Sequence, residues 1–221
     1  MSVEEMKKTK IDMKTYPRKA HFEYFRNLAY PYVGVTVNVD ITDLLKVIKG
    51  EGLPFFLTIL YAAANAANEV PALRRRIDGD GIVEYERCNT SHTVALEDGT
   101  YGYCVLDSSI DFREFLGYAE EQQNLARTRA SIEEGDKADS LFFVSSLPWL
   151  SYTAIVQPTP VPVDSNPRIT FGRYFEQNQR MLMPATILVN HALADGKHLS
   201  DFYKSLDAMM IYLVEEIRSM Y

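Results

Sequence analysis

The chain has 221 residues, of which 47% are hydrophobic and 24% charged, so it can bury a sizeable core. Its formal net charge of -7 argues against a nucleic-acid partner, which would need a basic stripe. No uncharged run is long enough to cross a membrane, and the first ten residues lack the apolar segment of a signal peptide. Cys88 and Cys104 have no metal or redox spacing, so we expect a cytoplasmic protein with reduced thiols.

The first part of the chain predicts one strand and two helices after a short amphipathic opening over residues 12–27. Valines alternate with polar or small residues over 33–41, which predicts a strand with one buried face. A helix over 43–49 can be capped by Thr42. Residues 55–69 have almost no polar face, which predicts a helix buried on all sides.

The rest of the chain is rich in short apolar runs. An Asp-Gly pair at 98–99 predicts a hairpin. Helices are predicted over 110–130 and, from the spacing of nine apolar residues, over 199–217. Closely spaced prolines make 157–167 a loop. The predicted strands are 82–87, 91–96, 101–106, 141–145, 151–156, 168–175 and 182–190.

Hairpins and long crossovers alternate along this order of elements. The sheet should therefore be mixed rather than purely parallel. We predict an α/β class, or an α+β sandwich, in which one domain over residues 1–221 packs helices on a large mixed β-sheet.

His191 marks the place where chemistry is expected. It follows the last predicted strand, four residues before the Asp195-Gly196 turn. The end of a strand would hold the ring rigidly, and imidazole is the side chain whose unperturbed pKa lies near neutral pH, so His191 could act as a general base. A core histidine, with Asp195 merely capping the next helix, explains the same spacing. A metal site formed with His198 is a weaker reading, because the spacing is not H-E-x-x-H and no cysteine lies nearby in sequence.

The chain resembles a known family nearly end to end. HALADG (191–196) fits the H-x-x-x-D-G signature of the CoA-dependent acyltransferase superfamily, and the chain is most similar to chloramphenicol acetyltransferases within it. The signature alone is only moderately specific, whereas its combination with the other blocks in this order is highly specific. The blocks are PRKAHFEYF (17–25), VDIT (39–42), FFVSSLPW (142–149), ITFGRY (169–174) and LMPATILVNHALADG (182–196).

This resemblance implies a mechanism of direct transfer without an acyl-enzyme. His191 would take a proton from an acceptor hydroxyl, which then attacks the thioester of acetyl-CoA, the co-substrate; no cofactor would be bound permanently. General-base catalysis of this kind is worth about 10²–10⁴ in rate. Ser145 would donate to the tetrahedral oxyanion, and losing such a donor costs about 10²–10³. Thr170 would assist through ordered water. From spacing alone, Ser145 is better explained as a strand-end serine.

Asp195 would act through Arg18, its implied partner across nearly the whole chain. The pair would fix the loop that carries the base. If it is truly buried, removing one partner should cost roughly 3–5 kcal/mol. Without the resemblance, Arg18 would be taken for a solvated surface residue.

The resemblance also assigns binding residues and an assembly. Trp149, Tyr174 and Arg173 fall where the family contacts CoA, although each has a plain structural alternative. A homotrimer is implied, in which the base of one subunit faces the acceptor pocket of the next. The acceptor-side positions would include Tyr24, Phe25, Ala29, Pro31, Val33, Tyr101 and Tyr103.

Departures from the usual family pattern gather around the acceptor rather than the catalytic set. Asn190 stands where the family has a first histidine, and Tyr103 replaces a residue that is usually small. We therefore expect acetyl transfer to a hydroxyl more firmly than we expect chloramphenicol as the acceptor. The other departures are Tyr16, Tyr24-Phe25, Pro31, Val33, Pro54, Phe56 and Ala194.

Three further functions remain open on the sequence alone. The chain could be a binding module of the same fold that holds a small aromatic ligand without catalysing a reaction, although intact His191, Ser145 and Asp195 argue against it. An acyltransferase like the 2-oxo acid dehydrogenase core would be expected to bring lipoyl and linker segments. A serine hydrolase is the least favoured, because G-x-S-x-G is absent.

Overall fold

The computed structural model describes residues 6–129, 131–132 and 135–220. Its helices are α1 Lys19–Phe25, α2 Thr42–Gly50, α3 Phe55–Asn68, α4 Phe112–Thr128 and α5 Gly196–Met220, with 3-10 turns η1 Pro71–Arg74 and η2 Gly135–Ser140. Its strands are β1 Lys8–Lys10, β2 Tyr32–Asp40, β3 Arg75–Asp78, β4 Gly81–Tyr85, β5 Asn89–Ala95, β6 Tyr101–Leu106, β7 Leu141–Leu147, β8 Arg168–Gly172, β9 Phe175–Gln177 and β10 Arg180–Asn190.

Within this part of the chain, seven strands form one large mixed sheet. The order is β2-β10-β8-β7-β5-β6, with β9 added beside the start of β10. β7 runs parallel to both β5 and β8, and the other pairs are antiparallel. The predicted mixed sheet is confirmed, and its two edges are β2 and β6.

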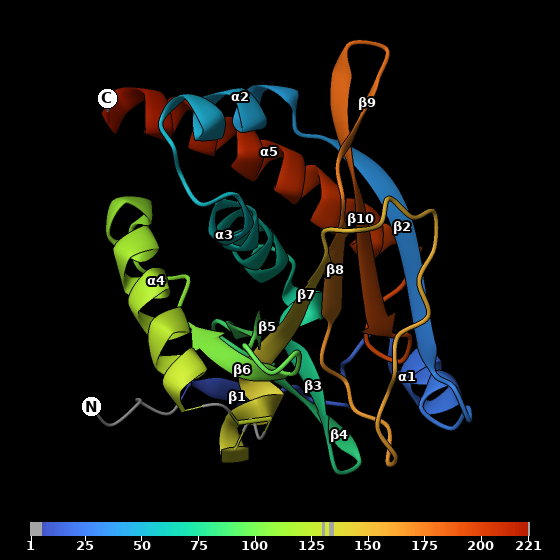
Figure 1. The fold of residues 1–221 in the computed structure, drawn as a ribbon. Helices are drawn as coiled ribbons and strands as arrows, with labels where there is room; N and C mark the ends of the chain where they lie inside the picture. The colour runs from blue at the N-terminus through green and yellow to red at the C-terminus, as the bar shows by residue number, and fades with distance from the viewer. Residues whose placement is uncertain (1–5, 130, 133–134, 221) are drawn as a thin grey trace.

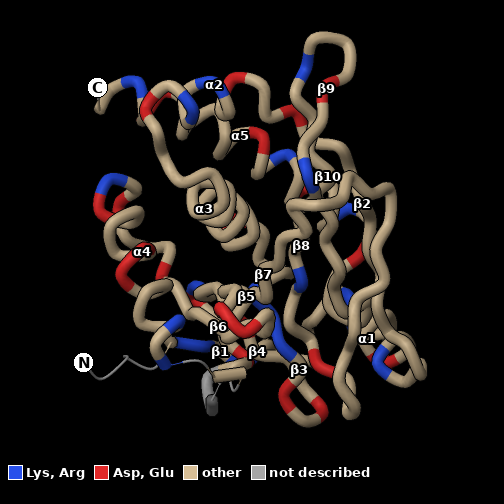
Figure 2. The backbone as a smooth tube through the Cα atoms, in the orientation of Figure 1, with Lys and Arg blue, Asp and Glu red and all other residues tan. Residues whose placement is uncertain are grey.

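The two faces of this sheet are covered differently. Helices α2, α3 and α5 lie together on one face, and α4 packs along β6 (Figure 1). Apolar residues of the central strands, such as Val144, Ile169 and Ile187, join these helices in the main core. α3 carries no charged residue and stands out as an uncharged stretch in Figure 2, as expected for a helix buried on all sides.

A second, smaller core fixes the region after β10. It joins Phe22 of α1, Ile82 of β4 and the adjacent Ala192 and Leu193, all nearly inaccessible to solvent. β4 belongs to a small antiparallel sheet of order β1-β4-β3. The turn that carries His191 is thus anchored by residues of α1 and β4.

Most predicted elements are confirmed within a few residues, but residues 151–156 are not a strand. They lie outside the large sheet and connect to it through side chains: Tyr152 Oη donates to the backbone oxygen of Thr170 at 2.8 Å. The prolines that follow lack the amide hydrogens that strand pairing needs. The predicted strand over 168–175 also divides, because β8 ends at Gly172 and β9 begins at Phe175.

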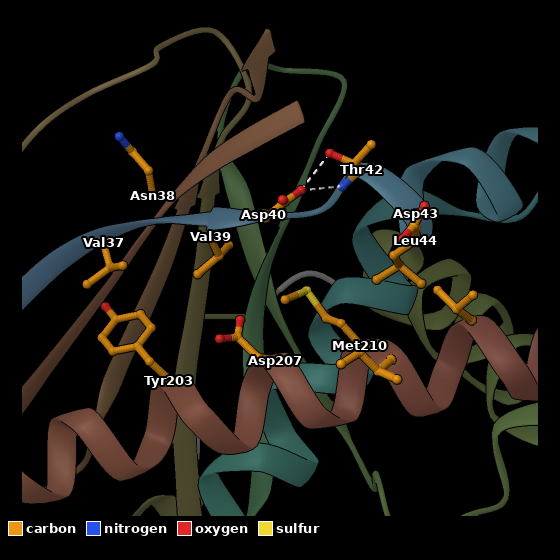
Figure 3. Close-up of a pocket in the computed structure, with 12 residues that line it drawn as sticks. Val37, Asn38, Val39, Asp40, Thr42, Asp43, Leu44, Tyr203, Asp207 and Met210 are labelled. Carbon is orange, nitrogen blue, oxygen red and sulfur yellow. Dashed lines mark hydrogen bonds between the residues drawn. The ribbon is translucent and has the colours of Figure 1, made fainter. Parts of the chain in front are cut away.

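The strand predicted over 33–41 has the expected alternation but less burial. Val37 and Val39 point toward α5 while Asn38 points away (Figure 3). Val37 is nevertheless 37% exposed, because β2 is an edge strand and a groove separates it from α5. Thr42 does not cap α2; it is the first helical residue, and its backbone N–H donates to the Asp40 carboxylate at 3.0 Å.

Candidate active site

His191 is held in one orientation by three contacts. Its Nδ1 lies 2.9 Å from the carbonyl oxygen of Ala194, which can only accept, so Nδ1 carries the proton and Nε2 is left with its lone pair. The ring of Phe25 stacks on the imidazole at 3.9 Å between centroids. The backbone N–H of His191 donates to Pro31 at 2.7 Å. The ring is only half-buried, so a substrate can reach it.

Asp195 connects the histidine turn to α1. Arg18 Nη1 donates to Asp195 Oδ2 at 2.5 Å, which confirms the predicted pairing. The other oxygen, Oδ1, accepts from the backbone N–H of Lys197 at 3.0 Å and lies 2.9 Å from His198 Nδ1. Asp195 therefore caps α5, as its position in the sequence allowed, and also pairs with Arg18, as the resemblance implied.

Electrostatics favour the charged form of Asp195. Partial burial opposes ionisation, but the hydrogen bond and charge of Arg18, together with His198, lower the pKa of Asp195 to about 2. The Arg18 and Asp195 side chains are 19% and 30% exposed. The pair is thus partly solvated within the chain, and the cost of about 3–5 kcal/mol expected for a buried pair does not apply to it.

Ser145 and Thr170 belong to a row of four hydroxyl residues across the helix-free face. Ser145 lies opposite Thr170, Thr170 opposite Thr186, and Thr186 opposite Thr36, so all four share one face. Thr186 and Thr36 are hydrogen-bonded at 2.7 Å between hydroxyl oxygens. Gln157 Nε2 donates to the Thr170 hydroxyl. The row joins the predicted oxyanion donor to the predicted auxiliary threonine.

A cavity of about 330 Å³ opens beside this row. Its lining includes Ser145, Thr170, Tyr101 and Tyr103, to which the resemblance assigns oxyanion, auxiliary and acceptor roles.

His92 also contributes to the wall of this cavity, but its ring contacts Phe56 and Gln123 on the helix-covered side of the sheet. Burial lowers the pKa of His92 to about 4, so the ring is neutral at physiological pH. The lining also includes Arg168, whose charge is paired with Asp164 at 2.7 Å. The rest of the wall is mostly aromatic, aliphatic or hydroxyl-bearing, and suits a small uncharged acceptor.

An apolar pocket of about 130 Å³ lies on the opposite, helix-covered side of β7. Phe55, Phe56 and Tyr174 contribute to its lining, and the exposed Arg173 contributes at its rim. Ser146 lines this pocket whereas the adjacent Ser145 lines the acceptor cavity. Two spaces thus approach the end of β7 from opposite faces of the sheet, which fits a narrow thioester arm entering from one side and an acceptor from the other.

Trp149 does not line either space. Its indole is 74% exposed beside Pro148, which does line the apolar pocket. The ammonium of Lys49 lies 5.5 Å from the Tyr174 ring centroid, so a second cation stands near Arg173. Sequence reasoning missed Lys49, because a helix-end lysine beside a glycine is an ordinary capping signal.

The remaining acceptor residues divide between two places. Tyr101 and Tyr103 are with Ser145, whereas Phe25 is stacked on His191 and Tyr24 packs edge-on against Phe25 at 5.1 Å. Ala29 and Val33 flank Pro31 and Tyr32, at the His191 end of β2. Within one chain, the acceptor residues are not assembled around one cavity.

The separation between the two places follows from the strand register. Thr186 lies two strands from Ser145, and His191 follows five residues later along β10. At about 3.3 Å per residue and 4.8 Å per strand, the backbones of His191 and Ser145 are roughly 15–20 Å apart. The two side chains of one chain cannot reach the same carbonyl carbon, which requires contacts of about 3 Å.

A larger hollow than the acceptor cavity lies elsewhere. It has a volume of about 490 Å³ between β2 and α5 (Figure 3), and none of the predicted site residues lines it. Its lining includes Asp40, Asp43 and Asp207 but no lysine or arginine. Such an anionic groove would repel the phosphates of CoA.

Comparison with known proteins supplies the family. The family described as "Chloramphenicol acetyltransferase" matches residues 6–207. The chain belongs to this family. It is 29% identical to the Clostridium butyricum chloramphenicol acetyltransferase over 90% of this chain and 93% of that one. With the Proteus mirabilis enzyme it shares 30% identity over 86% and 88%.

Solved structures support the same assignment. A chloramphenicol acetyltransferase superposes with a TM-score of 0.79 at 27% identity and covers 92% of this chain and all of the other. The Azotobacter vinelandii dihydrolipoamide acetyltransferase has a TM-score of 0.66 at 18% identity over 88% of each chain. The second likeness shows the fold alone.

Asn190, the departure from the usual motif of chloramphenicol acetyltransferases, has a structural role here. Its side chain is 1% exposed. Its Nδ2 donates to the Asp164 carbonyl at 3.0 Å and its Oδ1 accepts from the backbone of Ala192 at 3.0 Å. Asn190 therefore ties the histidine turn to the end of the proline-rich segment.

Among the described residues of this family member, no helix combines the length and the apolar composition that a membrane span requires.

Proposed function

We propose that this member of the family transfers the acetyl group of acetyl-CoA to a hydroxyl of chloramphenicol or a related small xenobiotic. The observation that carries the proposal is the oriented imidazole of His191, with Nδ1 tied to Ala194 and Nε2 left as the base. Nε2 takes the acceptor proton as the oxygen attacks the thioester carbonyl, and the CoA thiolate leaves and is reprotonated.

Ser145 stabilises the oxyanion of the tetrahedral intermediate. Its hydroxyl lies on the sheet face that lines the acceptor cavity, one residue from the apolar pocket that suits the pantetheine arm. Thr170, which lies opposite Ser145 on β8, assists the transition state through an ordered water. Arg173, Tyr174 and Trp149 contact CoA, with Arg173 near its phosphates. Arg18 and Asp195 position the turn that carries the base.

The active site is completed by a second copy of the chain. Since His191 and Ser145 of one chain are roughly 15–20 Å apart, the base must meet the oxyanion donor of a neighbour. Exposed apolar side chains near both places support such packing: Tyr24 and Tyr30 near His191, and Trp149 and Leu150 after β7, are all more than half exposed. We propose a homotrimer, in which each site combines Tyr24, Phe25, Ala29 and Val33 of one copy with Tyr101 and Tyr103 of the next.

Residues 1–221 act as a single domain in this proposal, and the protein works in the cytoplasm. Cys88 and Cys104 are free and buried, which suits a reducing compartment. The H-x-x-x-D-G residues His191, Asp195 and Gly196 supply the base, its support and the start of α5.

The test is release of CoA thiol from acetyl-CoA on addition of an acceptor alcohol, over a panel that includes chloramphenicol. His191→Ala should lower kcat by about 10²–10⁴ while its thermal unfolding stays close to that of the parent chain. Unchanged turnover in a folded His191→Ala variant would end the assignment of the base.

The acceptor panel separates the remaining alternatives. Turnover of other alcohols but not chloramphenicol would favour the same chemistry with a different acceptor. Ligand binding without thiol release would favour a non-catalytic relative.

A further inference from the structure

Polar side chains lie on the helix-free face of the sheet between the hydroxyl row and the turn that carries His191. Arg168 is two residues before Thr170 on β8, so the pleat places it on the same face as the row. On β10 the same alternation places Asn190 there, next to the turn, and Tyr32 lies opposite Asn190 on β2. Arg168, Asn190 and Tyr32 thus come from three strands.

Asp164 binds all three of these side chains. Its carboxylate accepts from both terminal nitrogens of Arg168, at 2.9 and 2.7 Å, and from Tyr32 Oη at 2.9 Å. Its carbonyl oxygen accepts from Asn190 Nδ2 at 3.0 Å. Burial and the neighbouring Asp164 carboxylate raise the pKa of Tyr32, so its hydroxyl keeps its proton as a donor. One residue therefore joins β2, β8 and β10.

Each side of this arrangement reaches a group with a role in the proposed reaction. Arg168 is part of the wall of the acceptor cavity. Asn190 directly precedes His191 in the chain. Tyr32 directly follows Pro31, whose carbonyl oxygen accepts from the backbone N–H of His191 at 2.7 Å. The contacts of one carboxylate and one carbonyl thus extend from the acceptor cavity to the base.

Asp164 is held in place by the two residues that follow it. Ser165 and Asn166 are both buried. Ser165 Oγ accepts from the backbone N–H of Ile77 at 3.0 Å, and Asn166 Nδ2 donates to the Leu141 carbonyl oxygen at 2.8 Å. The position of Asp164 is therefore fixed by β3 and by the start of β7, independently of the exposed prolines before it.

We propose that Asp164 is a positioning residue for both halves of the site. Through Asn190 and Tyr32 it holds the base half-site, which is the turn that carries His191. Through Arg168 it holds the cavity half-site, which is the acceptor cavity with its hydroxyl row. This inference rests on the proposed function, in which the two half-sites of one chain serve different active sites of the trimer. A misplaced base lowers kcat, whereas a displaced cavity wall raises the KM for the acceptor.

The experiment separates these two effects by placing the variant in one chain of a mixed trimer at a time. A Ser145→Ala chain supplies only the base half-site and a His191→Ala chain only the cavity half-site, so a trimer with both has one working site. Asp164→Ala is added to either chain. kcat and the KM for the acceptor are then measured by CoA-thiol release, with the alcohol of the panel that the parent enzyme acetylates fastest.

The two arrangements should give different kinetic changes. With Asp164→Ala in the chain that supplies the base, kcat should fall about 10-fold and the acceptor KM should stay within about 2-fold. In the chain that supplies the cavity, the acceptor KM should rise about 10-fold and kcat should stay within about 2-fold. A merely structural role would change the same constants in both arrangements.

Two further variants support the measurement. Asp164→Asn keeps the shape of the side chain and one acceptor oxygen, so it should show the same pattern at about 3-fold, and it decides the matter if the alanine chain does not fold. Glu216→Ala is the matched control: its side chain is 20% exposed, against 21% for Asp164, and it pairs with Arg113 between α4 and α5. Both constants should stay within about 2-fold of the parent in either arrangement.

Three outcomes would overturn the inference: unchanged constants in both arrangements, an effect in only one of them, or the same change in both. Absence of thiol release by the parent enzyme would instead contradict the proposed function. A mixed trimer that is inactive with Asp164 intact would contradict only the shared site. In that case the trimer with Asp164→Asn in every chain decides, because it must show both a lower kcat and a higher acceptor KM.

Discussion

At the scale of single residues, the site depends on how one histidine is supported. Ala194, Phe25 and Pro31 each fix a different part of His191, and Asp195 anchors the turn through Arg18. None of these contacts involves the lone pair of Nε2. These contacts therefore orient the ring and leave Nε2 available to accept a proton, which is what proton abstraction requires.

The lowered pKa of Asp195 predicts a specific acid sensitivity. Because the pKa falls from 3.8 to about 2 on folding, the ionised carboxylate contributes stability above about pH 4, and this contribution is lost as the pH falls toward 2. Asp195→Asn should therefore be less stable than the parent at neutral pH, and the gap should narrow below pH 4. Urea midpoints at pH 7, 5, 4 and 3 would measure this. A gap that is constant over this range would contradict the assignment of the charge.

The predictability of these residues differs for physical reasons. His191 and Ser145 stand in short contiguous blocks, and the resemblance identified both. The Arg18–Asp195 pairing was available only through the resemblance, since the two residues are separated by 177 positions. Gln157 could not be singled out, because an amide in a proline-rich loop has no pattern that reveals its partner on β8.

At the scale of elements, the segment after β7 is the feature that periodicity predicts wrongly. Residues 151–156 alternate like a strand, but the segment attaches to β8 through the side chains of Tyr152 and the following Gln157. Gly172, at the end of β8, makes this close approach possible. A Cβ placed there would lie 2.9 Å from both the Leu150 carbonyl oxygen and the Tyr152 ring. The long helices and central strands, by contrast, follow their hydrophobic periods because one face of each meets the core.

Gly172→Ala should displace this segment. We expect a loss of about 1–3 kcal/mol in unfolding free energy, because backbone stands where the methyl group must go. Turnover should fall as well, since the bonds from Tyr152 and Gln157 to Thr170 would be disturbed. Gly117→Ala is the matched control: Gly117 lies inside α4 and a Cβ there meets nothing within 4 Å.

The control variant should gain about 0.5–1 kcal/mol, the usual advantage of alanine over glycine inside a helix. Chemical unfolding and thiol-release assays on both variants supply the comparison. Equal behaviour of the two alanine variants would show that the segment does not pack against Gly172 as described.

At the scale of the whole molecule, the chain presents two half-sites. The His191 cluster lies at the end of β10, and the hydroxyl row with its cavity lies at the middle of the sheet. The family resemblance implied a site shared between subunits. Composition and periodicity alone could not place Ser145 and His191 apart, because their separation depends on strand register. The proposal of a site shared between copies rests on that register together with the exposed aromatic residues near each half-site, and the number of three copies is what the family resemblance implies.

Complementation between two inactive chains tests this account most directly. Differently tagged His191→Ala and Ser145→Ala chains are expressed together, and the assembly that carries both tags is assayed for acceptor-dependent thiol release. Each chain supplies what the other lacks, so in every trimer that carries both tags one of the three sites should contain both groups and restore activity in proportion. Mixed assemblies that form and stay as inactive as either parent would contradict a site shared between subunits.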